Sequence, residues 1–261
     1  MDRQALLAAF DEQIRRRPVP DRPGGRVEHD VGVIRSVGGG DGWTGVSWCK
    51  LDEAGADAAI AAQVRRFGEL ARPWEWKHYS YDSPADLAER LLAAGFEPEP
   101  AETLLVAEIA DLALEVPPPA GVELRAVAGS RDVEALVSVL DEVFGEDHSG
   151  LGRTLLADLG RRAADLAAVV AWAGDGPIAA GRVEFHAGTE FASLWGDGTV
   201  PAWRGRGVFR SLVAHRAALA SAAGFRYLQT DASAASRPIF QRLGFVELAT
   251  TTPFMHPGGA G

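Results

Sequence analysis

The sequence predicts an α/β protein with a mixed sheet (α+β), built from two similar halves. Strand-like alternation and helical spacing follow each other along the chain, a pattern typical of a sheet covered by helices. An aromatic strand, a turn and a short helix recur in the same order in both halves. The 261 residues, 47% apolar and 24% charged, suffice for one large domain or two modest ones with a buried core.

The boundary between the halves is expected at residues 117–121, where three prolines precede an alanine and a glycine. Such a segment is stiff and extended, and it cannot lie within a helix or a central strand. We therefore expect a first domain at 1–116, a linker at 117–121 and a second domain at 122–261.

The recurring unit supports this division. Asp82 lies fourteen residues before Phe96, and Asp231 lies fourteen residues before Phe245, each in a strand–turn–helix segment that ends in Gly-Phe. A degenerate tandem copy explains this spacing. Chance likeness is the alternative, since strand–turn–helix units are common.

The elements can be assigned in order from hydrophobic periodicity. The N-terminal residues 1–10 have the pattern of an amphipathic helix, and residues 76–81 that of a strand. The second half predicts the order strand, two helices, three strands, helix, strand, short helix and strand. Its predicted segments are 122–127, 132–144, 151–166, 167–173, 178–186, 191–196, a helix after 207, 225–231 and 238–245.

Three arginines, Arg204, Arg206 and Arg210, crowd the start of the helix that follows residue 207. Cations there oppose the helix dipole, each at a cost of roughly 0.3–1 kcal/mol. Gly205 and Gly207 allow a tight turn that leaves backbone N–H groups open. Together these features predict a binding site for a phosphorylated anion, with a basic surface turn as the alternative.

This loop and its surroundings resemble the GNAT family (GCN5-related N-acetyltransferases). The family's loop reads Arg/Gln-x-x-Gly-x-Gly/Ala between a strand and a helix, and Arg204, Gly207 and Phe209 occupy its marked positions. Phe209 departs from the small residue of the pattern. Many members also have a short helix ending in Leu-Gly-Phe, as at 243–245. The resemblance covers residues 122–254 and implies the GNAT fold, here in tandem with a degenerate first domain.

The resemblance implies acetyl-CoA as co-substrate and no metal ion. Backbone groups near Thr199 and Val200 would line the pantetheine arm, and the arginines would contact the phosphates. Of the three arginines, Arg204 is the one most firmly expected to contact phosphate, because it fills the first marked position of the loop. Ser233 stands where many members have an asparagine. The expected cofactor-binding residues are Thr199, Val200, Arg204, Gly205, Arg206, Gly207, Val208, Phe209, Arg210 and Ser233.

Acyl transfer to an amine needs a neutral amine, a route for its proton and a proton donor for the departing thiolate. Glu184, His186 and Asp197 are the expected catalytic residues, and Glu190 is a further candidate base. Glu184 and His186 alternate onto one face of a strand. Asp197 lies between two glycines just before the loop. Solvent-facing positions and ordinary turn chemistry explain the same residues.

The proton donor of many relatives is a tyrosine in the short helix, and Phe240 occupies that position here. Tyr227 is expected in the middle of a strand, as a core or edge residue. A donor must then come from elsewhere or from water. The second half contains no cysteine, so direct transfer in a ternary complex is expected rather than a thiol-linked acyl-enzyme.

In the first half, the segment that corresponds to the arginine loop is 51–57, and it is acidic. Asp52, Glu53 and Asp57 suit an ordinary helix start and would repel pyrophosphate. We expect this half to keep the fold without the cofactor site and to have a structural or substrate-shaping role.

The amino-acid composition limits the cellular compartment and the binding partners that we expect for the protein. A net charge of −10 and a pI near 5.1 argue against nucleic acid, and no Cys/His cluster suggests a metal. Cys49 is the single cysteine, which fits a reducing cytoplasm. No apolar run approaches the ~20 residues that span a bilayer, and residues 1–10 lack a signal-peptide pattern. The composition, rich in Ala, Gly and Arg, suits a bacterium with a high-GC genome.

These observations lead us to expect a cytoplasmic N-acetyltransferase that acts on a primary amine of a small molecule, as a monomer or homodimer. A mycothiol-synthase-like acyltransferase, which also pairs a degenerate with an active lobe, is a related alternative. A non-catalytic module that binds acyl-CoA or another protein is the alternative from a different class, and Phe209 and Phe240 are the residues that favour it.

Overall fold

The computed structural model describes residues 2–20, 22–40, 42–70, 72–161 and 164–259, which form a mixed sheet with helices on its faces. The chain separates into two compact units. The first comprises Met1–Leu105, Asp231–Pro238 and Glu247–Gly261. The second comprises Val106–Thr230 and Ile239–Val246.

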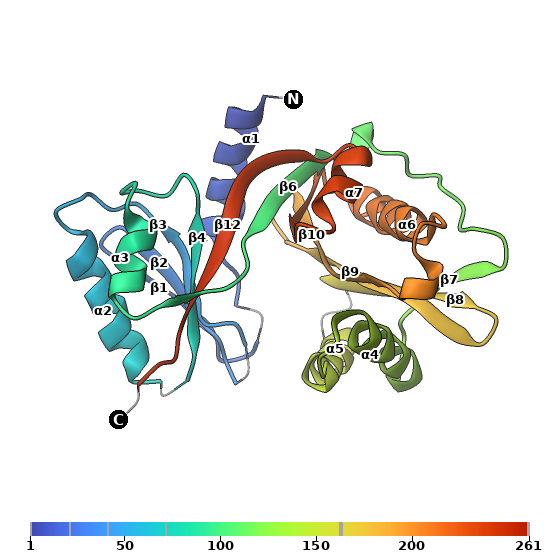
Figure 1. Ribbon diagram of the computed structural model, residues 1–261, viewed down its shortest axis with the longest axis horizontal. Helices are drawn as coiled ribbons and strands as arrows, with labels where there is room; N and C mark the ends of the chain where they lie inside the picture. The colour runs from blue at the N-terminus through green and yellow to red at the C-terminus, as the bar shows by residue number, and fades with distance from the viewer. Residues whose placement is uncertain (1, 21, 41, 71, 162–163, 260–261) are drawn as a thin grey trace. The chain divides into compact units, whose positions relative to one another are not determined.

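The first unit contains six strands from its own half of the chain and the last strand of the chain. Its sheet has the order β1-β2-β3-β4-β12-β6, in which β3 and β4 are parallel and β12 runs antiparallel to β4. Figure 1 shows β12 lying beside β4. The elements are α1 (Arg3–Phe10), a π-helical turn (Asp11–Arg15), α2 (Ala56–Gly68), α3 (Leu87–Ala93), β1 (Arg26–Asp30), β2 (Val33–Val37), β3 (Gly45–Cys49), β4 (Trp74–Tyr79), β5 (Glu97–Pro98), β6 (Glu102–Glu108) and β12 (Val246–His256).

The two faces of β4 have different roles in the first unit. Trp74 and Trp76 point into an apolar core shared with α2 and α3, where Phe67 of α2 stacks on Trp74 at 4.2 Å between ring centroids. The alternate residues of β4 lie on the opposite face. There Tyr79 contacts Phe10 of α1 at 6.0 Å between ring centroids.

The second unit continues with the order β6-β11-β10-β9-β8-β7, where β10 and β11 are parallel and β7 to β10 are antiparallel to their neighbours. The helix predicted at 151–166 corresponds to α5, but it ends at Arg161, and Leu166 is instead the first residue of β8. Residues 162–163 of that prediction lie outside the described residues. The elements are short 3-10 helices (Ile109–Asp111 and Pro201–Trp203), β7 (Val122–Ala126), α4 (Ser130–Phe144), α5 (Ser149–Arg161), β8 (Leu166–Ala173), β9 (Gly176–Phe185), β10 (Phe191–Thr199), α6 (Val208–Ala222), β11 (Tyr227–Ala232) and α7 (Arg237–Arg242).

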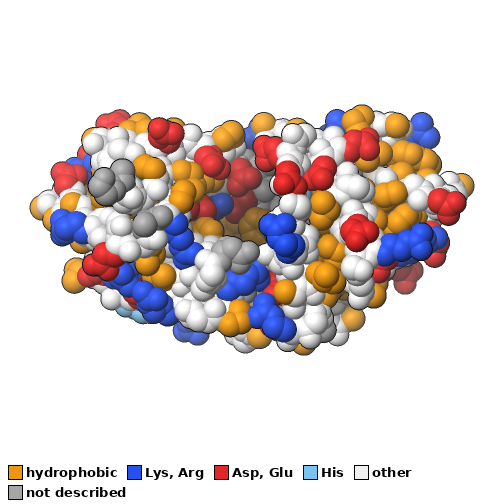
Figure 2. Space-filling view, turned by 90° about the horizontal axis from the view of Figure 1, so that it is seen from below, with side chains coloured by type: hydrophobic (Ala, Val, Ile, Leu, Met, Phe, Trp, Pro, Cys, Tyr) orange, Lys and Arg blue, Asp and Glu red, His pale blue; other side chains and the backbone are white. Residues whose placement is uncertain are grey.

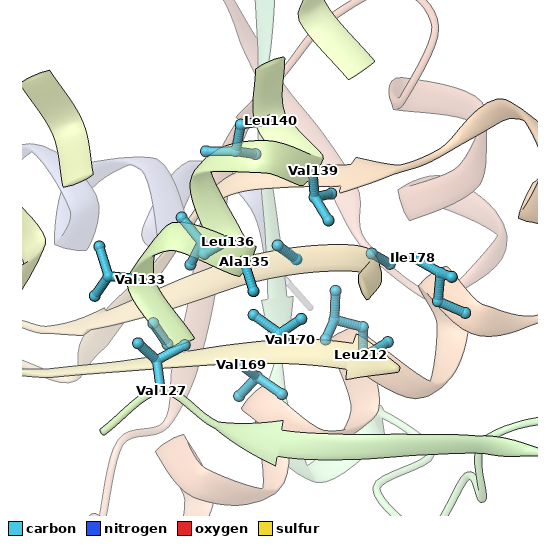
Figure 3. Packing of buried hydrophobic residues seen from close by; sticks show 14 of the residues in the cluster. Val127, Val133, Ala135, Leu136, Val139, Leu140, Val169, Val170, Ile178 and Leu212 are labelled. Atoms are coloured by element: carbon cyan, nitrogen blue, oxygen red, sulfur yellow. The ribbon is translucent and has the colours of Figure 1, made fainter. Parts of the chain in front are cut away.

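Helices cover both faces of the second sheet. Figure 1 shows α4 and α5 on one face of β8 and β9, and α6 on the other. The core brings Leu136 and Val139 of α4 together with Val170 of β8 and Ile178 of β9 (Figure 3). Leu212 of α6 joins the same cluster and is fully buried. This packing fixes α6, and therefore the arginine loop at its start, against β10.

The two halves of the sequence repeat the same topology. In the first, β2 and β3 are antiparallel, α2 follows, β4 is parallel to β3, and α3 precedes the last strands. In the second, β9, β10, α6, β11 and α7 repeat this order and these directions. This confirms the prediction of a mixed α/β sheet in a tandem arrangement.

The compact units, however, do not follow the expected division at residues 117–121. The last strand of the second half, β12, is counted with the first unit from Glu247 onward. The last strand of the first half, β6, is counted with the second unit from Val106 onward. Each unit is thus completed by a strand from the other half of the chain, which hydrophobic periodicity cannot reveal because both strands have the same pattern.

Among the described residues, no helix combines the length and the apolar character needed to cross a membrane. On the face drawn in Figure 2, acidic and basic side chains are interspersed.

Candidate active site

Strands β10 and β11 pair for only part of their length. The parallel register runs from Phe191–Tyr227 to Ser193–Gln229, and the Thr230 hydroxyl then donates to the Leu194 carbonyl at 3.1 Å. On its other edge β10 remains paired with β9 as far as Thr199, with an irregularity between Trp195 and Gly198. The last residues of β10 therefore have a sheet partner on one side and none from β11 on the other.

The end of β10 is tied to the arginine loop. Arg204 donates from Nε to the Thr199 carbonyl at 3.0 Å, and the Val200 N–H donates to the Ile178 carbonyl of β9. The Thr199 hydroxyl oxygen is buried and has no hydrogen-bond partner among the described residues. Thr199, Val200 and Arg204 thus lie together at the point where β10 leaves the sheet. Their roles in cofactor binding stay predictions.

The start of α6 presents unpaired backbone donors. The first N–H groups of any α-helix have no intrahelical acceptor. Gly207, the residue before α6, has a φ of 88° and provides no side-chain cap, and Gly205 has a φ of 73°. Positive φ values at both positions are ones that glycine adopts without strain. The N–H groups of Val208, Phe209 and Arg210 are the first of α6, and therefore the ones that an external acceptor could bind.

The arginines of the loop are exposed. Arg204, Arg206 and Arg210 are all solvent-accessible, and the Arg206 guanidinium lies 4.9 Å from the centroid of the Trp203 ring. Cations gathered at a helix N-terminus gain no stability from the helix dipole. An anion placed among them would interact favourably with both the side chains and the dipole.

Phe209 and Phe240 belong to one aromatic cluster. The Phe209 ring meets Phe240 edge-on at 5.3 Å between centroids, and Phe240 meets Phe245 at 5.0 Å. Phe240 is only 1% exposed. Phe209, the bulky residue at the last marked position of the loop, is therefore half-buried and packs against Phe240 of α7.

Ser233 is exposed and begins the turn into α7. Its hydroxyl lies 3.1 Å from that of Ser236, and its carbonyl accepts the Arg237 N–H at 2.9 Å. Ser233 is part of the first unit, whereas the arginine loop is part of the second. A role of Ser233 in cofactor binding stays a prediction.

Asp197 is held by an arginine inside the second unit. Its carboxylate contacts the guanidinium of Arg216 on α6, and the Arg216 side chain is fully buried. Arg216 also donates to the carbonyls of Leu212 and Arg182 at 3.1 and 3.0 Å. Burial raises the pKa of Asp197, and Arg216 opposes this rise. Gly181 lies against the pair, where an added Cβ would collide with it. The geometry is that of an internal ion pair.

His186 takes part in a hydrogen-bonded chain. Its Nε2 lies 2.5 Å from the hydroxyl of Ser193, which is fully buried on β10 and also accepts from the Gln229 side-chain amide on β11. With the Gln229 amide nitrogen facing Ser193, the Ser193 hydroxyl can donate to His186 Nε2 in the tautomer in which that nitrogen carries no proton. This hydrogen-bonded chain includes Ser193 and Gln229, the last residue pair in the register of β10 and β11.

The remaining candidate bases are paired at the surface. Glu184 is 38% exposed and accepts from Arg182 Nε at 3.0 Å. Glu190 lies 3.5 Å from the Arg226 guanidinium. The structure thus brings Glu184 and His186 to the same side of the sheet, beside Ser193, while Asp197 faces α6 on the other side.

Sequence reasoning missed Ser193, Gln229 and Arg216. The available signal was a polar residue inside an apolar run: Ser193 within β10, Gln229 within β11 and Arg216 within α6. Their partners are distant in sequence, so pairing them required the sheet register.

The equivalent helix start in the first unit, at α2, is preceded by Gly55 and likewise has no side-chain cap. Asp52 accepts the Gly55 N–H at 2.7 Å, and Asp57 lies in the first turn of α2. A groove of about 760 Å³ between α2 and α3 has acidic residues at Asp57, Asp86 and Glu89. Carboxylates therefore lie near the start of α2, where the start of α6 in the second unit has arginines. That this half lacks a cofactor site stays a prediction.

Within the described part of the chain, no group of three or more His, Cys, Asp or Glu side chains converges as a metal site.

Comparison with known proteins shows the fold to which this arrangement belongs. No family model matches the sequence, and a search of curated proteins finds no similar sequence. Among solved structures, a GCN5-related N-acetyltransferase from Kribbella flavida is similar with a TM-score of 0.68 and 20% identity, over 98% of this chain and 95% of that one.

Two further solved structures agree. A tandem GNAT protein from the clavulanic acid biosynthesis pathway has a TM-score of 0.63 and 14% identity, over 93% of this chain and 86% of that one. A GCN5-related N-acetyltransferase from Sphaerobacter thermophilus has a TM-score of 0.59 and 15% identity, over 87% and 78%. The chain has the GNAT fold in its tandem form.

Proposed function

We propose that the protein is an acyl-CoA-dependent N-acyltransferase that transfers an acetyl group from acetyl-CoA to a primary amine of a small molecule. The observation that carries this proposal is the uncapped start of α6 with its exposed arginines, directly after a strand that lacks a β11 partner at its end. An anionic group and an extended chain would be bound by these two features side by side.

The residues present fit acetyl-CoA. The N–H groups at 208–210, with Arg206 and Arg210, would hold the pyrophosphate, and Arg204 would fix the loop through its bond to the Thr199 carbonyl. The pantetheine arm would add to the free edge of β10 as an extra strand, and the unpaired Thr199 hydroxyl would lie beside it.

The reaction proposed is direct transfer in a ternary complex. The neutral amine nitrogen attacks the thioester carbonyl carbon, the C–N bond forms, the C–S bond breaks, and coenzyme A leaves as a thiolate. The amine loses one proton to a base, and the thiolate takes one up. The protein contributes by binding the two substrates in position and by providing the path for the proton.

We propose His186 as the proton acceptor, with Ser193 as the link to it. Ser193 lies at the last paired residue before β10 and β11 diverge, and its hydroxyl lies 2.5 Å from His186 Nε2. Glu184, on the same face, is the second candidate. Asp197 is assigned a positioning role, because its carboxylate is engaged by Arg216.

One observation favours a binding module without turnover. Phe240 is buried among other aromatic rings and has no hydroxyl with which to protonate a thiolate. Under the transferase proposal this proton comes from water. We further propose a cytoplasmic location and a monomer or homodimer, in keeping with the single, buried Cys49 thiol.

The test is thiol release from acetyl-CoA with a panel of primary amines. We expect amine-dependent release of coenzyme A by the wild type and a loss of release in an Arg206→Glu/Arg210→Glu variant. Arg153→Glu is the matched control, since Arg153 is an exposed arginine on α5. Binding of acetyl-CoA without release for any amine would favour the non-catalytic module.

A further inference from the structure

The outward face of β4 in the first unit carries charge. Trp74 and Trp76 fill the core, so Glu75 and Lys77 lie on the opposite face of the same strand. Strand β4 is central, with β3 on one side and β12 on the other. Charged residues there are costly unless they are paired or bind a ligand.

Lys77 is surrounded by carboxylates from distant parts of the chain. Its Nζ lies 3.0 Å from Asp231 Oδ2 and 3.6 Å from Glu102 Oε2. The Asp231 side chain is 4% exposed and that of Lys77 is 17% exposed. Glu75 adds a third carboxylate, so the acidic groups outnumber the single ammonium.

Two carboxylate oxygens in this cluster have no partner. Glu75 accepts from the Trp43 indole N–H at 2.6 Å through Oε2, while its Oε1 is buried and without a hydrogen bond. Asp231 Oδ1 is likewise buried and unpartnered among the described residues. Both unpartnered oxygens are hydrogen-bond acceptors, so a ligand that binds them must donate hydrogen bonds.

The charge balance calls for a cation as well. Burial raises the pKa of Glu75 and of Glu102, and Lys77 only partly opposes this in both cases. The neighbouring carboxylate of Asp231 adds to the rise for both groups. A positive ligand would relieve this repulsion, which a water molecule cannot do.

An aromatic side chain stands at the edge of the cluster. Trp43, whose indole binds Glu75, is 37% exposed although it is a large apolar residue. Carboxylates beside an accessible indole are a combination that recognises organic ammonium groups, through charge, hydrogen bonds and the ring face.

We propose that Glu75, Glu102 and Asp231, which all belong to the first unit, bind an organic ammonium group. The ammonium would donate hydrogen bonds to the unpartnered Glu75 Oε1 and Asp231 Oδ1.

The experiment is calorimetric titration of spermidine into the full chain without coenzyme A, in roughly 150 mM salt to screen unspecific attraction. We expect binding that weakens roughly tenfold in Glu75→Gln, the loss expected for a hydrogen bond to a charged group. Glu75→Gln leaves the Lys77–Asp231 pair in place. Glu53→Gln, which changes an exposed carboxylate of the same unit, is the matched control.

The outcomes are distinguishable from those of the acetyl-CoA experiment. No heat with spermidine, equal binding in wild type and Glu75→Gln, or equal competition by Mg²⁺ would overturn the ammonium site even if acetyl-CoA binds.

Discussion

Asp197 shows how a single residue acquires its role from a partner that the sequence does not indicate. A carboxylate between two glycines, just before the arginine loop, has the position expected of a base. In the folded protein its charge is balanced by Arg216, which has no exposed side-chain surface. Removing one member of a buried ion pair leaves an uncompensated charge.

We therefore expect Asp197→Asn to lower the free energy of unfolding by about 3–5 kcal/mol. Urea unfolding of the variant beside Asp175→Asn, an exposed turn residue, measures this loss. Thiol release by the folded fraction should stay within a few-fold of wild type. A large decrease in kcat with an unchanged free energy of unfolding would instead identify Asp197 as the base.

The hydrogen bonds that link Gln229, Ser193 and His186 lead to a second prediction. His186→Ala should lower kcat by roughly 10²-fold or more, the usual contribution of a general base. Ser193→Ala removes the hydroxyl that faces His186 Nε2, so it should lower kcat and change the pH profile of the reaction while KM for acetyl-CoA stays constant. A pH profile identical to wild type in both variants would exclude His186 and leave Glu184 as the candidate.

Among the elements, the short helix α7 departs from the pattern of the proteins that the sequence resembles. The site of the usual tyrosine is Phe240, whose ring packs against Phe209 and Phe245. Phe240→Tyr would place a hydroxyl among these rings, where an unsatisfied polar group costs about 1–3 kcal/mol. We expect thermal unfolding to show this loss and thiol release to show no gain in kcat. A gain in kcat without loss of stability would mean that the ring edge faces the thiolate.

Individual elements could be predicted from sequence because their signals are local. The helices α4 and α6 and the strands β7 to β11 occur where periodicity and glycine signals place them. The open start of α6 also follows from Gly205, Gly207 and the absence of an acidic cap. The Ser193 chain, the Asp197–Arg216 pair and the carboxylates around Lys77 depend on contacts across the sheet, so local patterns could not reveal them.

At the scale of the whole molecule, each compact unit is completed by the last strand of the other half. Strand β12 pairs with β4 over six residue pairs, from Thr251–Tyr79 to His256–Trp74. A fragment of residues 1–116 lacks this strand, and the edge of β4 would be exposed together with the apolar side chains that β12 covers.

Neither residues 1–116 nor residues 122–261 should therefore fold alone. We expect each fragment to give a poorly dispersed NMR spectrum, and the full chain to unfold in one cooperative transition. A well-dispersed spectrum from either isolated fragment would show that the exchanged strands are dispensable. The linear division that the prolines suggest cannot anticipate this, since strand pairing is set by the whole sheet.

The most direct test of the central claim is calorimetric titration of acetyl-CoA into the wild type, Arg204→Ala, Gly207→Glu and the control Arg153→Glu. Binding by the wild type and the control, lost or much weakened in the two loop variants, is the result that an anion site at the start of α6 requires. Absence of binding in the wild type, or equal binding in all four proteins, would contradict it.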